Sequence, residues 1–145
     1  MSLQLPRWSR AFGPLAACGF LLTAGCSDGP FKIVGVSGSV SYEDGTPIPS
    51  DDYRLKFVPQ VASPDGKTYP RIATAMVGAD GTFDFATTYK YKDGLTVGEH
   101  LVYLRIGKGE GGKPLVPAEY LSAKTTPLKI DVSKSRRIEL KVPKP

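Results

Sequence analysis

Side chains able to carry acid–base, nucleophilic or metal chemistry are scarce in this sequence of 145 residues. It contains one histidine, His100, and two cysteines, Cys18 and Cys26. A single histidine excludes a multi-histidine metal site, and the two cysteines do not have the spacing of a zinc pair. His100 falls inside a predicted strand, where a lone histidine is typical of a packed or solvent-facing residue. We therefore predict that the protein is not an enzyme and uses no cofactor or metal.

Three aspartates, Asp44, Asp51 and Asp52, lie close together in the sequence. Carboxylate oxygens bind calcium, but a usable site needs six or more converging oxygens, and the spacing of an EF-hand loop is absent. Aspartate is also a preferred turn residue, because its side chain bonds to nearby backbone N–H groups. We interpret the three aspartates as turn residues.

Three tyrosines, Tyr69, Tyr89 and Tyr91, fall in predicted loops and are candidate ligand-binding residues. In an extended segment, alternate spacing would put Tyr89 and Tyr91 on one face. Together with Tyr69, they would then form an aromatic platform able to stack on a sugar ring. The alternative is that the rings cap the edge of the β structure and bind nothing.

Basic residues accumulate near the C-terminus. Near an anionic membrane or an acidic polysaccharide they would add a weak, screened attraction. The alternative is a charged edge strand that discourages aggregation. The net charge of +5 includes two leader arginines, and the remaining excess is too small to indicate a nucleic-acid partner. The C-terminal set is Lys134, Arg136, Arg137, Lys141 and Lys144.

Residues 1–25 have the organisation of a targeting segment. Arg7 and Arg10 form a positive region, and an apolar run follows over 11–22. That run is too short for a permanent membrane-spanning helix. We predict a leader over 1–25, a tether over 26–32 and one folded domain over 33–145.

The stretch Leu21-Leu22-Thr23-Ala24-Gly25-Cys26 resembles the lipobox of bacterial lipoproteins. The resemblance implies cleavage between Gly25 and Cys26, acylation of Cys26 by palmitate-type chains, and anchoring to a membrane of the cell envelope, on its periplasmic or surface face. A rival site at Cys18 follows Leu15-Ala16-Ala17, but its apolar region is too short. An ordinary secretory signal with an incidental cysteine is the other alternative.

The remainder of the chain alternates apolar and polar residues with a period of two, which is typical of half-buried strands. Sixteen glycines and 13 prolines supply the turns. The turn over 78–81 predicts a hairpin between the third and fourth strands. The sequence therefore predicts an all-β, seven-stranded, two-sheet sandwich. Its strands are expected over 33–42, 53–57, 72–77, 82–86, 98–106, 128–132 and 138–142, with one helical turn over 116–120.

The segment over 36–48, VSGSVSYEDGTPI, resembles the opening strand and turn of carboxypeptidase-regulatory-like (transthyretin-like) domains. The segment over 79–85 is similar to their Asp-Gly hairpin, and 95–102 to a later strand in which His100 replaces an aromatic residue. The late segments over 116–120 and 126–128 are similar to small lipoproteins of planctomycete-type bacteria. The resemblance implies a transthyretin-like or Ig-like sandwich.

We expect an envelope lipoprotein that acts as a non-catalytic binding or display module for a glycan or protein. The first alternative is a structural subunit that assembles through sheet edges, as transthyretin-like folds can. The second is a transthyretin-related hydrolase, which would need several polar residues, usually including histidines, at a subunit interface. The expected partners are membrane lipid through Cys26 and a glycan or envelope protein, with the oligomeric state left open.

Overall fold

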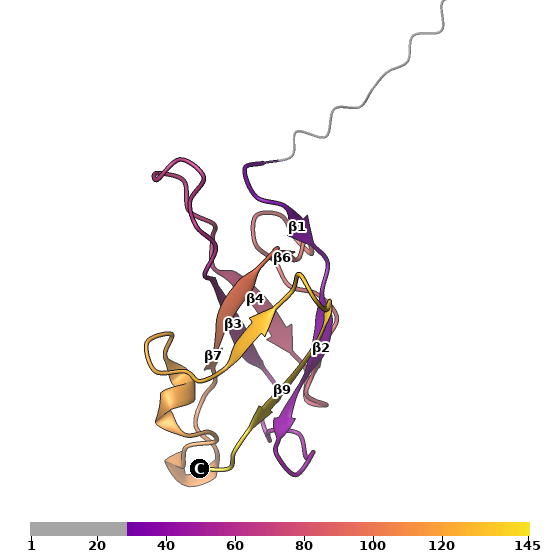
Figure 1. The fold of residues 1–145 in the computed structure, drawn as a ribbon. Helices are drawn as coiled ribbons and strands as arrows, with labels where there is room; N and C mark the ends of the chain where they lie inside the picture. The colour runs from indigo at the N-terminus through magenta and orange to yellow at the C-terminus, as the bar shows by residue number, and fades with distance from the viewer. Residues whose placement is uncertain (1–28) are drawn as a thin grey trace, which may run out of the picture.

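The computed structural model describes residues 29–145, and these form an all-β fold, as predicted (Figure 1). Two short 3-10 helices, η1 (Glu110–Gly112) and η2 (Ala118–Leu121), interrupt the strands. No helix within 29–145 is long and apolar enough to span a bilayer. The strands are β1 (Ile33–Val34), β2 (Ser37–Tyr42), β3 (Tyr53–Pro59), β4 (Ala73–Val77), β5 (Thr82–Phe83), β6 (Leu95–Thr96), β7 (Glu99–Arg105), β8 (Lys129–Asp131) and β9 (Arg137–Val142).

These strands form three sheets. A four-stranded antiparallel sheet has the order β4-β3-β7-β8, and a three-stranded sheet has the order β5-β2-β9. Within the smaller sheet β2 and β9 run parallel, although they come from opposite ends of the domain sequence. The third sheet is the short pair β1-β6, which lies where the chain enters the domain (Figure 1).

The two larger sheets bury their apolar faces in one shared core. Along β3, the side chains of Tyr53, Leu55 and Phe57 are buried and alternate with outward residues. The rings of Phe57 on β3 and Phe83 on β5 lie 6.2 Å apart, so they join the two sheets. Burial of each large apolar side chain contributes about 1.5–3 kcal/mol to this packing.

The predicted hairpin between 72–77 and 82–86 is wrong in its pairing. The turn itself forms, because the Gly78 N–H donates to the Thr82 carbonyl at 3.0 Å. Beyond it, β5 pairs with β2 rather than with β4, and the chain returns to β4 only at an isolated bridge between Thr74 and Thr87. Phe83 thereby enters the shared core. Burial of one large ring thus outweighs the local tendency of the turn to close a hairpin.

Two further predictions change in detail. The predicted first strand over 33–42 is divided into β1 and β2, and the short strand β6 was not predicted.

The part of the tether that the structure describes is held by the domain. Phe31 is 8% exposed, and the Lys32 carbonyl accepts a hydrogen bond from the Val97 N–H at 2.9 Å. The helical turn predicted over 116–120 is present as η2.

Candidate functional site

The three tyrosines singled out in the sequence are exposed. The exposed fractions are 66% for Tyr69, 42% for Tyr89 and 76% for Tyr91. Tyr69 lies in the loop over 60–72, and the other two lie in the loop over 87–94. Both loops lie at the end of the domain where the chain enters (Figure 1). We call this region the entry end and define it by residues 29–33 and the two loops.

The loop over 87–94 is a tight turn and not the extended segment assumed in predicting a shared face for Tyr89 and Tyr91. The Asp93 carboxylate accepts hydrogen bonds from the N–H groups of Thr88, Tyr89 and Lys90 at 2.7–2.8 Å. Burial alone would raise the pKa of Asp93, but these three bonds together lower it. Lys92 has a φ of 65° within the same turn.

Each tyrosine ring of this loop has its own partner. The Arg71 guanidinium lies 5.3 Å from the ring centroid of Tyr89, which connects the two loops. The Tyr91 ring packs edge-on against Phe85 at 5.3 Å. The rings of Tyr89 and Tyr91 are therefore exposed but packed against different neighbours, so they do not form one flat platform. A groove of about 860 Å³ lies beside Tyr89 and is lined by Pro30, Phe31 and Ile33, among others.

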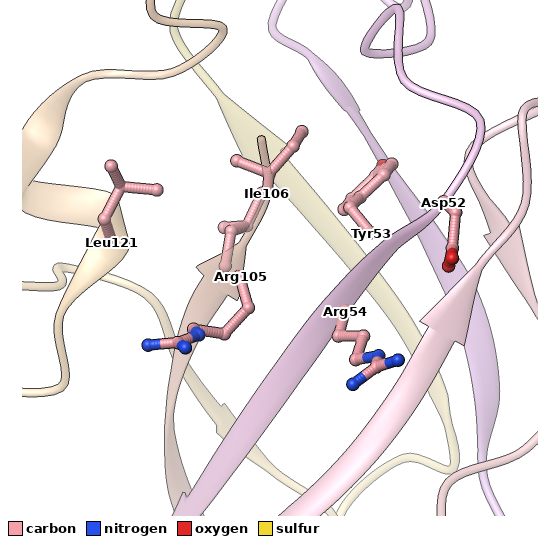
Figure 2. Close-up of a pocket in the computed structure, with 7 residues that line it drawn as sticks. Asp52, Tyr53, Arg54, Arg105, Ile106 and Leu121 are labelled. Carbon is pink, nitrogen blue, oxygen red and sulfur yellow. The ribbon is translucent and has the colours of Figure 1, made fainter. Parts of the chain in front are cut away.

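A second candidate site lies on the four-stranded sheet and was not predicted. It is a shallow hollow of about 440 Å³ at the start of β3 and the end of β7, lined by Asp52, Arg54, Arg105, Ile106 and Leu121, with Tyr53 and Leu104 beneath. We call it the arginine hollow (Figure 2). It lies toward the end of the domain that carries η2 and the C-terminus, away from the entry end (Figure 1).

Arg54 and Arg105 are directly opposite each other in the β3–β7 register. Within residues 29–145, neither guanidinium forms an ion pair with a carboxylate. Arg54 instead donates its Nε–H to the sulfur of Met76 at 3.2 Å. Figure 2 shows the two guanidinium groups turned apart along the outer face. Like charges placed directly opposite each other in a sheet are destabilising, so this pair has a cost to the fold.

Arg54 and Arg105 point outward because buried and outward positions alternate along β3 and β7. Their opposition depends on the register between two strands that are far apart in the sequence. One row along, Lys56 is opposite Tyr103 in the same register, and its ammonium group donates to Thr74 at 2.7 Å. The outer face therefore carries three cationic groups and one aromatic residue on neighbouring positions of two strands.

His100 is packed inside the domain with an exposed fraction of 1%. Its ring lies edge-on to Phe57, and its Nδ1 is 3.2 Å from the Gly98 carbonyl oxygen. Burial lowers the pKa of His100, and this outweighs the opposing influence of the Gly98 carbonyl and Asp131. The side chain lines neither the groove nor the arginine hollow.

The acidic and basic residues singled out in the sequence do not gather at one site. Asp44 accepts hydrogen bonds from the N–H and hydroxyl of Thr46 and pairs with Lys144 at 2.6 Å. These contacts hold the pKa of Asp44 well below its usual range, and the contact with Lys144 has the largest effect. Asp51 and Asp52 are exposed. Between Gly29 and Pro145, no group of three or more His, Cys, Asp or Glu side chains is placed to hold a metal ion.

The basic C-terminal residues do not form one cluster. Lys134 pairs with Asp131 at 3.5 Å, Arg137 with Glu139 at 3.8 Å, and the Lys141 ammonium donates to Ser41. The predicted cleavage and lipidation residues Gly25 and Cys26 lie outside the described residues. Comparisons with protein-family models, with curated proteins and with solved structures found no match for this chain.

Proposed function

We propose that this protein is a lipid-anchored lipoprotein of the bacterial cell envelope and acts as a non-catalytic binding module. The leader and the stretch ending at Cys26 support the anchoring. The shared core of the two larger sheets supports a sandwich of the transthyretin-like type. In this proposal the lipid sets the location and the rigid sheets present a binding surface to the surroundings.

The ligand is an anionic glycan, and it binds at the arginine hollow. The observation that carries this proposal is the opposition of Arg54 and Arg105 without a carboxylate partner inside 29–145. A pair that costs stability has a use if a ligand neutralises it. The guanidinium groups are turned apart, which suits a chain with repeated carboxylate or sulfate groups better than one small anion (Figure 2). Ile106 and Leu121 supply an apolar wall for the sugar rings.

The test is binding to heparin and to polygalacturonate, with neutral dextran as the reference glycan. We expect the wild-type protein to bind both anionic glycans and to ignore dextran. Arg54→Gln and Arg105→Gln should each weaken binding about tenfold, because each removes one charge-assisted contact. Arg137→Gln is the matched control, since it removes an exposed arginine from the other sheet. Equal losses in all three variants would indicate general charge attraction and overturn the site.

A second candidate function, self-assembly through a sheet edge, is favoured by the charge pattern of β9. This strand is at the edge of its sheet, and its outward side chains are Arg137, Glu139 and Lys141. Antiparallel pairing with a second copy about Leu140 would set Glu139 opposite the second copy's Lys141, twice. The test is molar mass by light scattering over a range of concentrations. Glu139→Lys should abolish the dimer, and the added change Lys141→Glu should restore it. A monomer at every concentration would exclude this function.

A further inference from the structure

We propose that the entry end rests on the anionic headgroup surface of the membrane, so that the tyrosine loops contact lipid and the arginine hollow points away from it. This inference rests on the proposed anchoring at Cys26. It assigns Tyr69, Tyr89 and Tyr91 to the membrane interface rather than to a sugar. The occupant of this surface is the lipid headgroup layer.

The chain between Cys26 and the domain has a short reach. Gly29 is three residues after Cys26 in the chain, and three Cα–Cα steps span at most about 11 Å. The chain beyond Gly29 gives no further slack. Phe31 is buried, the Lys32 carbonyl is bonded to Val97, and β1 pairs with β6. An acyl group on Cys26 would therefore hold the entry end within about one Debye length of the headgroups.

The entry end also has an excess of positive charge, with five exposed cations and two carboxylates. The cations of the entry end are exposed, whereas its two carboxylates accept hydrogen bonds from backbone N–H groups of their own loops. Asp93 accepts three backbone N–H groups, and Asp65 accepts those of Lys67 and Thr68 at 2.9 and 2.6 Å. Negative lipid surfaces attract such juxtamembrane cations. The exposed cations are Lys32, Lys67, Arg71, Lys90 and Lys92.

Two of these cations, Arg71 and Lys92, lie over aromatic rings. The Lys92 ammonium lies 4.6 Å from the ring centroid of Phe85 and 5.2 Å from that of Tyr91, and Arg71 lies over Tyr89. Tyrosine has an apolar body and a polar tip, and it is enriched at the level of the lipid headgroups for that reason. Exposed rings beside cations thus suit a membrane interface, because the rings lie at the headgroup level and the cations are attracted to anionic lipids.

The cationic surface continues on the other side of Lys32. A small hollow of about 220 Å³ brings Lys32 together with Lys134 and Arg136, from the turn between β8 and β9. Part of the basic C-terminal set therefore lies beside the entry end. The opposite end of the domain, with η1, η2 and the C-terminus, would then face away from the membrane (Figure 1).

The experiment is lysine acetylation of the native full protein, purified from membranes and placed in vesicles of phosphatidylglycerol and phosphatidylethanolamine. Labelling rates are read by mass spectrometry and compared with the same protein in detergent. We expect Lys90 and Lys92 to be protected about fivefold or more in the vesicles. Lys108 and Lys124, exposed near η1 and η2, are the controls and should label equally in both.

The charge requirement is tested with vesicles of phosphatidylcholine alone and with paired variants. Protection of Lys90 and Lys92 should fall in the neutral vesicles. In Lys90→Glu/Lys92→Glu, protection is read at the exposed entry-end lysines Lys32 and Lys67 and should fall as well. In Lys108→Glu/Lys124→Glu, protection of Lys90 and Lys92 should be retained. The same spectra report the state of Cys26. An unmodified Cys26 overturns the anchoring itself. A lipidated Cys26 with unprotected Lys90 and Lys92, or with equal protection of the control lysines, overturns the docking alone.

Discussion

The entry end and the arginine hollow hold their cations in different ways. At the entry end, Arg71 and Lys92 lie over aromatic rings, and the nearby carboxylate of Asp93 is used by backbone N–H groups. At the hollow, Arg54 and Arg105 are opposite each other and no ring of the described chain lies over either guanidinium. The first arrangement stabilises the domain by itself, whereas the second has no such compensation within 29–145 and, in the proposed function, is neutralised by a ligand. Mutations that remove contacts at the entry end should therefore lower the stability, whereas removing one of the two opposed arginines should raise it.

The largest expected effect on stability is at Gly94, where the loop over 87–94 packs closely against the backbone of β1. Its φ is 109°, and an added Cβ would collide with the backbone carbonyl of Val34. We expect Gly94→Ala to cost about 3 kcal/mol of unfolding free energy, measured by urea denaturation. Gly111→Ala is the matched control, because Gly111 also has a positive φ but has open space around it. That control should cost about 1 kcal/mol. Equal losses would show that the entry end is no more constrained than an exposed loop.

The next effect is at Asp93, whose carboxylate organises the tyrosine loop. Asp93→Ala leaves three N–H groups without their acceptor, and we expect a loss of about 2 kcal/mol. Because the pKa of Asp93 is lowered in the folded state, its contribution is present above its ordinary pKa and is lost as pH falls through the lowered value. The melting temperatures of variant and wild type should therefore converge below about pH 4.

Asp51→Ala is the control for this loop, because Asp51 is exposed and forms no side-chain hydrogen bond to any residue of 29–145. It should leave the melting temperature unchanged at neutral pH. A loss in Asp51→Ala equal to that in Asp93→Ala would mean that removal of negative charge, and not the loop's hydrogen bonds, lowers the stability.

The sequence was sufficient to predict most of the longer strands, but not the short strand β6 or the contacts between distant strands. The outward positions of Arg54 and Arg105 follow from a period of two, yet their opposition requires the β3–β7 register. The departure of β5 from β4 likewise depends on a core partner for Phe83, namely Phe57. The loop position of Tyr89 was predicted, but the turn that replaces the assumed extended segment depends on one carboxylate five residues beyond Thr88. Local patterns thus indicate which face of a strand is buried, and long-range packing decides which strands lie next to one another.

A smaller effect is expected at His100, which belongs to neither region and serves as a reference for pH dependence. Burial lowers the pKa of His100, so the unfolded chain binds its proton more readily. Its neutral form stabilises the fold above about pH 6.5, and this contribution falls as pH drops toward the lowered pKa. His100→Phe should remove the pH dependence of the melting temperature between about pH 5 and 7. A wild-type melting temperature that is flat across that range would contradict the burial argument.

The smallest effect distinguishes the hollow from the entry end by its sign. Replacing Arg105 by threonine, a good strand residue, relieves its opposition to Arg54, so we expect a gain of about 0.5 kcal/mol in unfolding free energy. Added salt should raise the stability of the wild type more than that of Arg105→Thr, because screening weakens the repulsion that only the wild type has. Arg137→Thr is the control: it removes a partner of Glu139 and should give no gain. A loss of stability in Arg105→Thr would mean that its side chain contributes packing against Ile106 and Leu121, and the hollow would then resemble the entry end.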